Sequence, residues 1–415
     1  MNKLKILHVN FSSSRGGAAR AVFRINEALN RSGLSNSRIL YVDCNINFSG
    51  NIFFSNFQRL LNFFKRSLIF FFKKIEVYNY NFKANLSYNF FNCNYLVDYL
   101  NTQKVFDIIN LHWVNGEMLS IKDISNLKKN FVWTFHDMWP FSGSEHISID
   151  NNRWIKGYNI KSFFDFSAKT WIKKKKYWKN PIQIVAPSSW IKHCVNVAKL
   201  TKNWPVSVIP NTIDTKVWKI NNKSYLRKKF NINRDIRIVM FSALGGGNEY
   251  YKGKDLLIKA LKILKKKIDF EIIVVGENFS RTLSTLGIKT YYFGHINDDY
   301  LLSDIYNCAD VCVVPSRIES FCLTALEAQS CGIPVVAFNV SGLKDIIISN
   351  KTGFLAKPYS YNDLEKKILL ILSNKKIATL MSKNSRQRVL KSFSYPVIAK
   401  QYSNFYLRVV KNKNG

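Results

Sequence analysis

Residues 315–337, PSRIESFCLTALEAQSCGIPVVA, decide the fold that we expect for this chain. The apolar run VCVV at 311–314 comes directly before them and has the length of a buried strand. A polar loop follows, then a helical stretch at 323–331, and the tripeptide GIP leads into a second apolar run. Strand, loop, helix and strand in this order predict an α/β fold built on a parallel sheet.

The same alternation continues on both sides of this stretch. We expect strands at 5–10, 37–42, 107–111, 131–135, 182–186, 236–242, 270–275, 290–293, 311–314 and 335–338. The segment 204–218 interrupts the alternation with two prolines and a turn-forming Asn-Thr pair. Since 415 residues are about 2.8 times the usual ~150-residue domain, we predict two doubly wound α/β domains, residues 1–208 and 209–394.

The chain is strongly basic, with 62 Lys and Arg against 27 Asp and Glu, a net charge of +35. This excess favours an anionic partner: nucleic acid, a phospholipid surface or a phosphorylated substrate. Seven cysteines without a C-x-x-C pair favour a reducing cytoplasm over a disulfide framework or a zinc site. We find no secretory signal and no run of ~18 apolar residues, so we expect a cytoplasmic protein that does not span a membrane.

Two glutamates in the deciding stretch are candidate ligand-binding residues. Glu319 follows a strand, at the sheet edge where open α/β sheets bind ligands, and Glu327 lies eight residues later on the expected helix. They could contact a sugar and a ribose of one extended ligand, with a phosphate at the helix start between them. The alternative is a capping loop and one solvated glutamate, which the apolar neighbours of Glu327 disfavour.

A glycine pair near the amino terminus has two possible explanations. Gly16-Gly17 separates the first expected strand from the first expected helix. Backbone N–H groups there could approach a phosphate closely, or the pair could form an ordinary tight turn.

The spacing E-x₇-E within ESF..TALEA..CGIPVVA resembles the retaining GT-B glycosyltransferases of the family-four type. Other motifs similar to that family are Gly16-Gly17, Ile184–Cys194, Val208–Trp218 and Lys252-Gly253. NLHWVNG at 110–116 and WTFHDMWPFSG at 133–143 resemble the branch that builds bacterial O-antigen, capsule and exopolysaccharide. The resemblance implies the GT-B architecture: two Rossmann-like domains that face each other across a cleft, with helix 395–411 crossing back to the first domain.

The resemblance also implies roles for individual residues. Glu319 would hold hydroxyls of the transferred sugar, Glu327 would accept hydrogen bonds from the donor ribose, and His136 would contact the sugar from the amino-terminal domain. Glu319 and His136 are therefore the candidate catalytic residues. The candidate donor-binding residues are Gly16, Gly17, Lys252, Phe321, Cys322, Leu323, Thr324 and Glu327. From composition alone, Lys252 would be one more surface lysine.

The sequence departs from the family pattern near the donor phosphates. Gly245–Gly247 occupy the place of an arginine before the Lys-Gly motif, so either Arg15 or Arg317 substitutes or donor binding is weaker. Cys322 stands where the family has glycine. The six histidines are scattered along the sequence, and we expect no metal and no cofactor, with a nucleoside-diphosphate sugar as substrate.

The segment 52–74 is rich in phenylalanine and in cations. It suits an anionic membrane surface, single-stranded nucleic acid or, as the plain alternative, a core-facing helix with solvated lysines. An enzyme acting on a lipid-linked acceptor needs the membrane surface, so we prefer a peripheral protein on the cytoplasmic face of the inner membrane. The expected membrane-contact residues are Phe63, Phe64, Lys65, Arg66, Phe70, Phe71, Lys73 and Lys74.

The predicted function is a metal-independent, retaining, hexosyl-type glycosyltransferase. It would move a sugar from a nucleoside-diphosphate sugar to a lipid-linked or oligosaccharide acceptor in bacterial surface polysaccharide synthesis. One rival is a GT-B-fold sugar-nucleotide epimerase, which would have little use for the aromatic and basic segment. The other is a basic nucleic-acid-binding protein, disfavoured by the wide spread of charge and by the lack of a zinc-knuckle or RNP-type motif.

Overall fold

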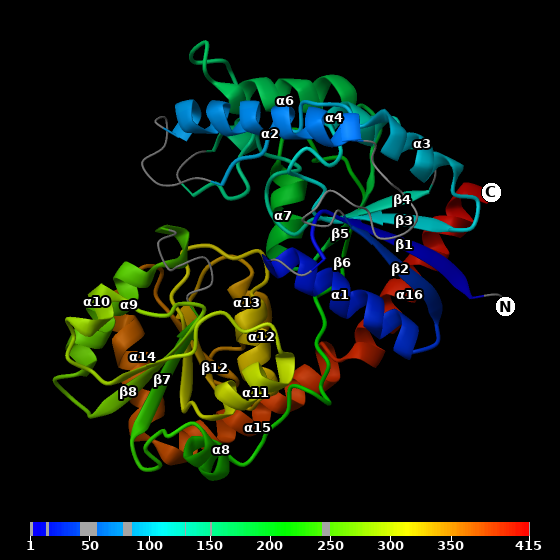
Figure 1. Ribbon diagram of the computed structural model, residues 1–415. Helices are drawn as coiled ribbons and strands as arrows, with labels where there is room; N and C mark the ends of the chain where they lie inside the picture. Colours follow the sequence, from blue (N-terminus) through cyan, green and yellow to red (C-terminus); the bar gives the residue numbers. More distant parts are fainter. Residues whose placement is uncertain are drawn as a thin grey trace. The chain divides into compact units, whose positions relative to one another are not determined.

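The computed structural model describes residues 3–13, 16–41, 56–77, 85–128, 130–149, 152–242 and 250–414. The chain divides into two compact units (Figure 1): unit 1 is Met1–Thr212 with Tyr395–Gly415, and unit 2 is Ile213–Ser394. Each unit contains a six-stranded sheet in which every pairing is parallel. The predicted α/β class with two doubly wound sheets is confirmed.

The sheet of unit 1 has the strand order β2-β1-β3-β4-β5-β6. Its strands are β1 Leu4–Asn10, β2 Ser35–Tyr41, β3 Ile108–Leu111, β4 Phe131–Thr134, β5 Gln183–Ala186 and β6 Val206–Val208. Its helices are α1 Gly16–Arg31, α2 Asn56–Val77, α3 Asn94–Thr102, α4 Ile121–Ser125, α5 Arg153–Lys156, α6 Phe166–Tyr177, α7 Ser189–Val197 and α16 Tyr395–Asn414. The chain leaves β1 for β2 on one side and later for β3 on the other, so the sheet changes direction between β1 and β3.

The last helix, α16, belongs to the core of unit 1 although all of unit 2, Ile213–Ser394, lies between α16 and the rest of unit 1 in the sequence. It buries an apolar stripe at helical spacing against α1 and the sheet. The stripe consists of Ile398, Ala399, Tyr402, Phe405, Tyr406 and Val409. The Tyr406 hydroxyl accepts a hydrogen bond from Asn110 Nδ2 at 2.7 Å, and Tyr395 donates to Glu27 at 2.9 Å.

The sheet of unit 2 has the strand order β12-β11-β10-β7-β8-β9. Its strands are β7 Arg237–Ser242, β8 Phe270–Val275, β9 Thr290–Tyr292, β10 Val311–Val314, β11 Val335–Phe338 and β12 Gly353–Ala356. Its helices are α8 Lys223–Lys229, the 3₁₀ turn η1 Tyr250–Lys252, α9 Lys254–Leu264, α10 Arg281–Ser284, α11 Asp299–Asn307, α12 Leu323–Ser330, α13 Leu343–Ile346, α14 Tyr361–Ser373 and α15 Lys375–Ser392. The change of direction lies between β7 and β10.

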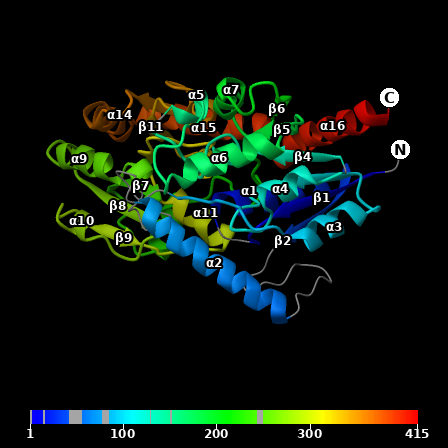
Figure 2. The ribbon, with the colours of Figure 1, turned by 90° about the horizontal axis from the view of Figure 1, so that it is seen from above.

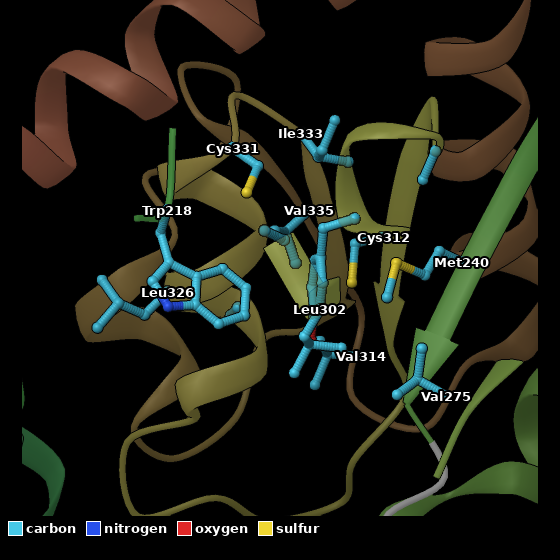
Figure 3. Close-up of a cluster of buried hydrophobic side chains, with 14 of the residues drawn as sticks. Trp218, Met240, Val275, Leu302, Cys312, Val314, Leu326, Cys331, Ile333 and Val335 are labelled. Carbon is cyan, nitrogen blue, oxygen red and sulfur yellow. The ribbon is translucent and has the colours of Figure 1, made fainter. Parts of the chain in front are cut away.

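Strands β10 and β11 of unit 2 are apolar throughout because helices cover both faces of the sheet. Along β10, Cys312 and Val314 pack into one cluster with Trp218 and Leu326 (Figure 3). Val311 and Val313 point to the opposite cluster, under α9 and α14. This is why the VCVV run in the sequence shows no polar alternation.

The elements that were not predicted from the sequence include β6, β12 and α15. β6 and β12 are only three and four residues long, too short for a clear apolar run. Helix α15 is mostly polar and buries only Met381, Ser385 and Val389, so its periodicity is weak. The predicted domain boundary followed residue 208, at the end of β6, whereas the division between the compact units falls after Thr212.

Helix α2 lies on the same side of unit 1 as α4 and α6, at the top of Figure 1 and toward the reader in Figure 2. Its inner face contributes Ile69 and Phe72 to a small cluster with Tyr88 and Phe166. The buried Glu76 carboxylate accepts hydrogen bonds from the Tyr88 hydroxyl at 2.5 Å and from Ser167 N at 2.7 Å. Over the described residues, no helix is both long and apolar enough to cross a bilayer.

Burial raises the pKa of Glu76 to about 7, although the Tyr88 and Ser167 hydrogen bonds act in the opposite direction. The folded protein therefore binds a proton more tightly than the unfolded chain, and this stabilisation is lost as the pH rises from about 4.5 through 7. We expect Glu76→Gln to remove on the order of 2–3 kcal/mol from the pH dependence of the unfolding free energy between pH 5 and 8.

Urea unfolding followed by tryptophan fluorescence measures this dependence, and Glu27→Gln on α1 is the matched control because Glu27 is only half-buried. The control should keep the wild-type slope. An unchanged slope in Glu76→Gln would show that Glu76 is already ionised in the folded protein.

Candidate functional site

The loops that follow β7 and β10 meet where the unit 2 sheet changes direction, the usual position of a ligand site in such sheets. Gly253 has φ +68°, and a Cβ there would collide with the Pro315 carbonyl. The two loops therefore touch through their backbones, which explains the glycine of the Lys-Gly motif.

Arg317 fastens this contact. Its guanidinium forms two hydrogen bonds to the Asp255 carboxylate, at 2.8 and 2.7 Å, and a third to the Tyr250 carbonyl. It also lies 3.9 Å from the centre of the Tyr250 ring. Burial alone would raise the pKa of Asp255, but Arg317 holds it below its ordinary value. This arginine is committed to a structural pair; Arg15, the other suggested substitute, lies outside the described residues.

Lys252 and Glu319 form an ion pair at the same junction. Lys252 Nζ lies 2.7 Å from Glu319 Oε1, which also accepts a hydrogen bond from Ser316 Oγ at 2.9 Å. Ser341 and Gly342, after β11, hold the Glu319 backbone at both its N–H and its carbonyl. Within the part of the chain that the structure describes, Glu319 Oε2 has no hydrogen-bond partner. Loops that follow three neighbouring strands, β7, β10 and β11, thus converge on Glu319.

Helix α12 begins directly after this loop. Cys322 precedes it with φ +88°, a backbone conformation that normally favours glycine. Burial raises the pKa of the Cys322 thiol, so the thiol stays protonated. The Phe321 ring packs on Phe393 in the core, whereas Leu323 and Thr324 in the first turn are half-buried. The helix start therefore presents backbone amides close to Glu319 and Lys252.

Glu327 lies further along α12 and faces inward. Its side chain is 2% exposed, and the Tyr306 hydroxyl of α11 donates to Glu327 Oε2 at 3.3 Å. A buried carboxylate is costly unless it is hydrogen-bonded, so this position is not that of an ordinary solvated glutamate.

Three histidines meet in unit 1 where its sheet changes direction. His8 lies in β1, His112 follows β3 and His136 follows β4. His8 Nδ1 is 2.8 Å from His112 Nε2, and His112 Nδ1 is 2.9 Å from His136 Nε2. His8 and His112 are buried and His136 is half-buried. The histidines that are scattered in the sequence are therefore brought together by the sheet.

A second set of hydrogen-bonded side chains holds Asp137, the residue after His136. His146 Nδ1 lies 2.6 Å from Asp137 Oδ2, and His146 Nε2 lies 2.8 Å from Ser87 Oγ. Trp113 Nε1 donates to the same Asp137 oxygen at 3.0 Å. Burial alone would raise the pKa of Asp137, but His146 holds it below its ordinary value. The order Ser–His–Asp is that of a hydrolase triad, but Ser87 is only 3% exposed and too buried to act as a nucleophile. The group therefore orients the loop that carries His136 and Asp137.

Lys174, within the WIKKKKYWK stretch of α6, is the main support of this loop. Its ammonium donates to the carbonyls of Trp139, Ser142 and Gly143 and lies 3.7 Å from the Trp139 ring centre. Burial lowers its pKa well below the ordinary value. Nothing in the sequence separates Lys174 from its three neighbouring lysines, so its inward position could not be predicted.

Gly16 and Gly17 begin α1, as expected for a glycine loop before a helix. Gly16 has φ +88°, and a Cβ on either glycine would meet no atom of the described residues within 4 Å. The space beside them is open in unit 1.

The outer face of α2 is apolar. Phe64, Phe70 and Phe71 are each more than half exposed, and Lys74 Nζ lies 5.0 Å from the centre of the Phe70 ring. Lys65 and Lys73 turn toward the protein instead: Lys65 donates to the Asn92 carbonyl at 3.5 Å, and burial lowers the pKa of Lys73. The side chains of Phe63 and Arg66 lie outside the described residues.

The loop before α6 extends this apolar surface, which sequence reasoning missed. Ile160, Phe163 and Phe164 are 56%, 78% and 47% exposed. They connect to α2 through Phe166, which stacks on Phe72 with ring centres 4.9 Å apart. We call these three residues together with Phe64, Leu68, Phe70, Phe71 and Lys74 the aromatic surface. The signal available in the sequence was the FF pair at 163–164 beside lysines.

Comparison with known proteins gives a consistent picture. Residues 223–388 match the family described as glycosyl transferases group 1. An uncharacterized glycosyltransferase of Methanocaldococcus jannaschii is 28% identical over 54% of this chain and 59% of its own length. A D-inositol 3-phosphate glycosyltransferase of Paenarthrobacter aurescens is 34% identical over 38% of this chain and 41% of its own length. A capsular polysaccharide biosynthesis glycosyltransferase of Staphylococcus aureus is 25% identical over 56% of this chain and 63% of its own length. The matched part thus spans 41 to 63% of these relatives.

Solved structures match almost the whole chain. A sucrose-phosphate synthase of Thermosynechococcus elongatus superposes with a TM-score of 0.68, at 20% identity, over 99% of this chain and 100% of that one. The HepE protein of Anabaena in complex with UDP-glucose gives 0.62 at 17% identity, over 97% and 99%. A lipopolysaccharide glycosyltransferase, WaaG, gives 0.62 at 14%. At these identities the likeness establishes the GT-B fold.

Proposed function

We propose that the chain, which matches the group 1 glycosyltransferase family over residues 223–388, transfers a sugar from a nucleoside-diphosphate sugar to a glycan acceptor with retention of configuration. The observation that carries this proposal is the Lys252–Glu319 pair at the point where the unit 2 sheet changes direction. A cation and a carboxylate with one unengaged oxygen are placed there beside a helix amino terminus, which suits a ligand that contains both phosphate and sugar hydroxyls.

Each group has a distinct task in the proposed reaction. The bond between the sugar and the leaving phosphate breaks, a bond to the acceptor hydroxyl forms on the same face, and the acceptor proton passes to the phosphate oxygen. Lys252 and the amides at the start of α12 stabilise the charge that develops on the leaving diphosphate. Glu319 Oε2 accepts hydrogen bonds from sugar hydroxyls. Glu327 accepts hydrogen bonds from the ribose hydroxyls. Gly16, Gly17 and His136 bind the donor from the amino-terminal domain.

The donor class is supported by the HepE complex, which contains UDP-glucose, and the acceptor class by relatives named for capsule and lipopolysaccharide synthesis. Both cations are paired with a carboxylate, but the Arg317 side chain is only 8% exposed and that of Lys252 is 33% exposed, so Lys252 is the cation that we assign to the diphosphate. We propose no metal and no cofactor. The domain that ends near residue 208 takes the acceptor, and the one that follows takes the donor.

The aromatic surface supports a location on the cytoplasmic face of an anionic membrane. Its exposed rings would insert shallowly at the headgroup level, and Lys74 would meet lipid phosphate. Lys169 lies 4.4 Å from the Phe163 ring centre and supplies a further cation. A net charge of +35 favours the same partner. A lipid-linked acceptor would be reached from this position.

The first test is turnover with a panel of nucleoside-diphosphate sugars. With the active donor, Glu319→Gln should lower kcat more than donor affinity, whereas Lys252→Met should lower both, each by about ten- to a hundredfold. Lys267→Met is the matched control, because Lys267 also pairs with a glutamate, Glu365, but precedes β8 instead of following β7 or β10. Product analysis separates transfer from epimerisation of the donor. Wild-type kinetics in Glu319→Gln would refute its assigned role.

Glu327→Ala should weaken donor binding in calorimetry by on the order of tenfold to a hundredfold, since a charge-assisted acceptor is worth about 1.5–3 kcal/mol. Tyr306→Phe is the control, because it removes the same buried hydrogen bond and keeps the carboxylate. Equal losses in both variants, or unchanged affinity with a native circular dichroism spectrum, would exclude ribose binding by Glu327.

Vesicle co-sedimentation tests the membrane contact. Combining Phe70→Ser, Phe71→Ser and Lys74→Glu should reduce binding to anionic vesicles on the order of a hundredfold or more, because two inserted rings and a cation are lost. Leu380→Ser with Lys383→Glu, on the exposed face of α15, is the matched control. Wild-type protein should be released by high salt. If the triple variant still pellets like the wild type, the aromatic surface is not the membrane contact. If the wild-type protein is retained on polynucleotide but not on vesicles, nucleic acid is the favoured partner.

A further inference from the structure

The histidines of unit 1 form a continuous hydrogen-bonded line across the ends of three neighbouring strands. Each contact joins a Nδ1 atom of one imidazole to a Nε2 atom of the next, at 2.8 Å for His8–His112 and 2.9 Å for His112–His136. The strands follow each other in the sheet in the order β1, β3, β4. The line therefore runs from the buried interior at His8 to the half-buried His136.

All three imidazoles are neutral at physiological pH. Burial lowers the pKa of His8 to about 3 and that of His136 to about 4, and it lowers the pKa of His112 well below its ordinary value. A neutral imidazole has one N–H donor and one acceptor nitrogen. Because every contact needs one of each, the tautomers are coupled, and the three protons must all point toward His136 or all point toward His8.

The buried end of the line decides between these two patterns. His8 Nε2 is buried and, among the residues that the structure describes, has no hydrogen-bond partner. If the protons pointed toward His8, this atom would carry an N–H without an acceptor, and orphaned buried N–H groups are rarer than under-satisfied acceptors. If they point toward His136, His8 Nε2 is only an unused lone pair. The second pattern is the less costly one.

We propose that His8 and His112 fix the tautomer of His136 so that its Nδ1 carries a proton and donates a hydrogen bond to a substrate oxygen. Over the described residues, His136 Nδ1 has no partner within the protein, so that N–H is available. His136 therefore binds a sugar or phosphate oxygen and does not act as a base. His8 and His112 are positioning residues. The substrate in this statement rests on the proposed function; the tautomer does not.

Nuclear magnetic resonance of the full chain with ¹⁵N-labelled histidine tests the tautomer directly, because long-range ¹H–¹⁵N correlations distinguish a protonated Nδ1 from a protonated Nε2. His136, identified by its loss in His136→Gln, should show a protonated Nδ1, as should His8 and His112. A protonated Nε2 on His136 in the wild-type protein would overturn the proposal. This measurement requires no enzyme activity, so the tautomer of His136 can be established even if the protein does not transfer sugar.

Substitution of His112 tests the coupling. Asn Nδ2 occupies nearly the place of His Nδ1, so His112→Asn keeps the donor to His136 Nε2, whereas His112→Leu removes it. We expect His136 to keep its Nδ1 proton in His112→Asn and to become a mixture of tautomers in His112→Leu. With the active donor, kcat/KM should fall about tenfold in His112→Leu and recover in His112→Asn. Equal tautomers in both folded variants would refute the coupling.

Discussion

The contact between the backbones at Gly253 and Pro315 is the constraint on which the candidate donor site depends. It lets the loops after β7 and β10 touch, and the paired guanidinium of Arg317 and carboxylate of Asp255 keep them there. A bidentate pair of this kind fixes direction as well as distance. Lys252 precedes the glycine and Glu319 follows the arginine by two residues, so their ion pair is a consequence of how the two loops are fastened.

This arrangement also explains a departure from the family pattern. The arginine expected before the Lys-Gly motif is absent from the sequence, and Arg317 was one candidate to replace it. Arg317 pairs with Asp255 and its side chain is only 8% exposed, so it stabilises the loops, and Lys252 is the cation that we propose for the diphosphate. Cys322 shows a related compromise: a residue with a side chain adopts φ +88° at the start of α12, a conformation that costs on the order of 1–2 kcal/mol outside glycine.

The parts that could be predicted from the sequence are those that depend on local pattern. Apolar runs predicted every strand except β6 and β12, because burial on both faces leaves no polar alternation. The E-x₇-E spacing placed Glu319 on a loop and Glu327 on the next helix. The histidine line could not be predicted, because it depends on β1, β3 and β4 being neighbours. The local signal was that His112 and His136 lie within two residues of the end of a strand. The inward turn of Lys174 depends on where three carbonyls of a distant loop lie.

Both sheets carry polar side chains near the ends of buried strands, where burying a charge is costly, and each sheet lowers that cost in a different way. In unit 2 opposite charges neutralise each other, whereas in unit 1 the line of imidazoles stays uncharged. Two protonated imidazoles with ring centres 5.0 to 5.2 Å apart would repel by about 3 kcal/mol at an effective dielectric constant near 20. Burial adds to that cost. In a chain of net charge +35, neutral histidines supply a hydrogen-bonding site without adding another positive charge to the interior.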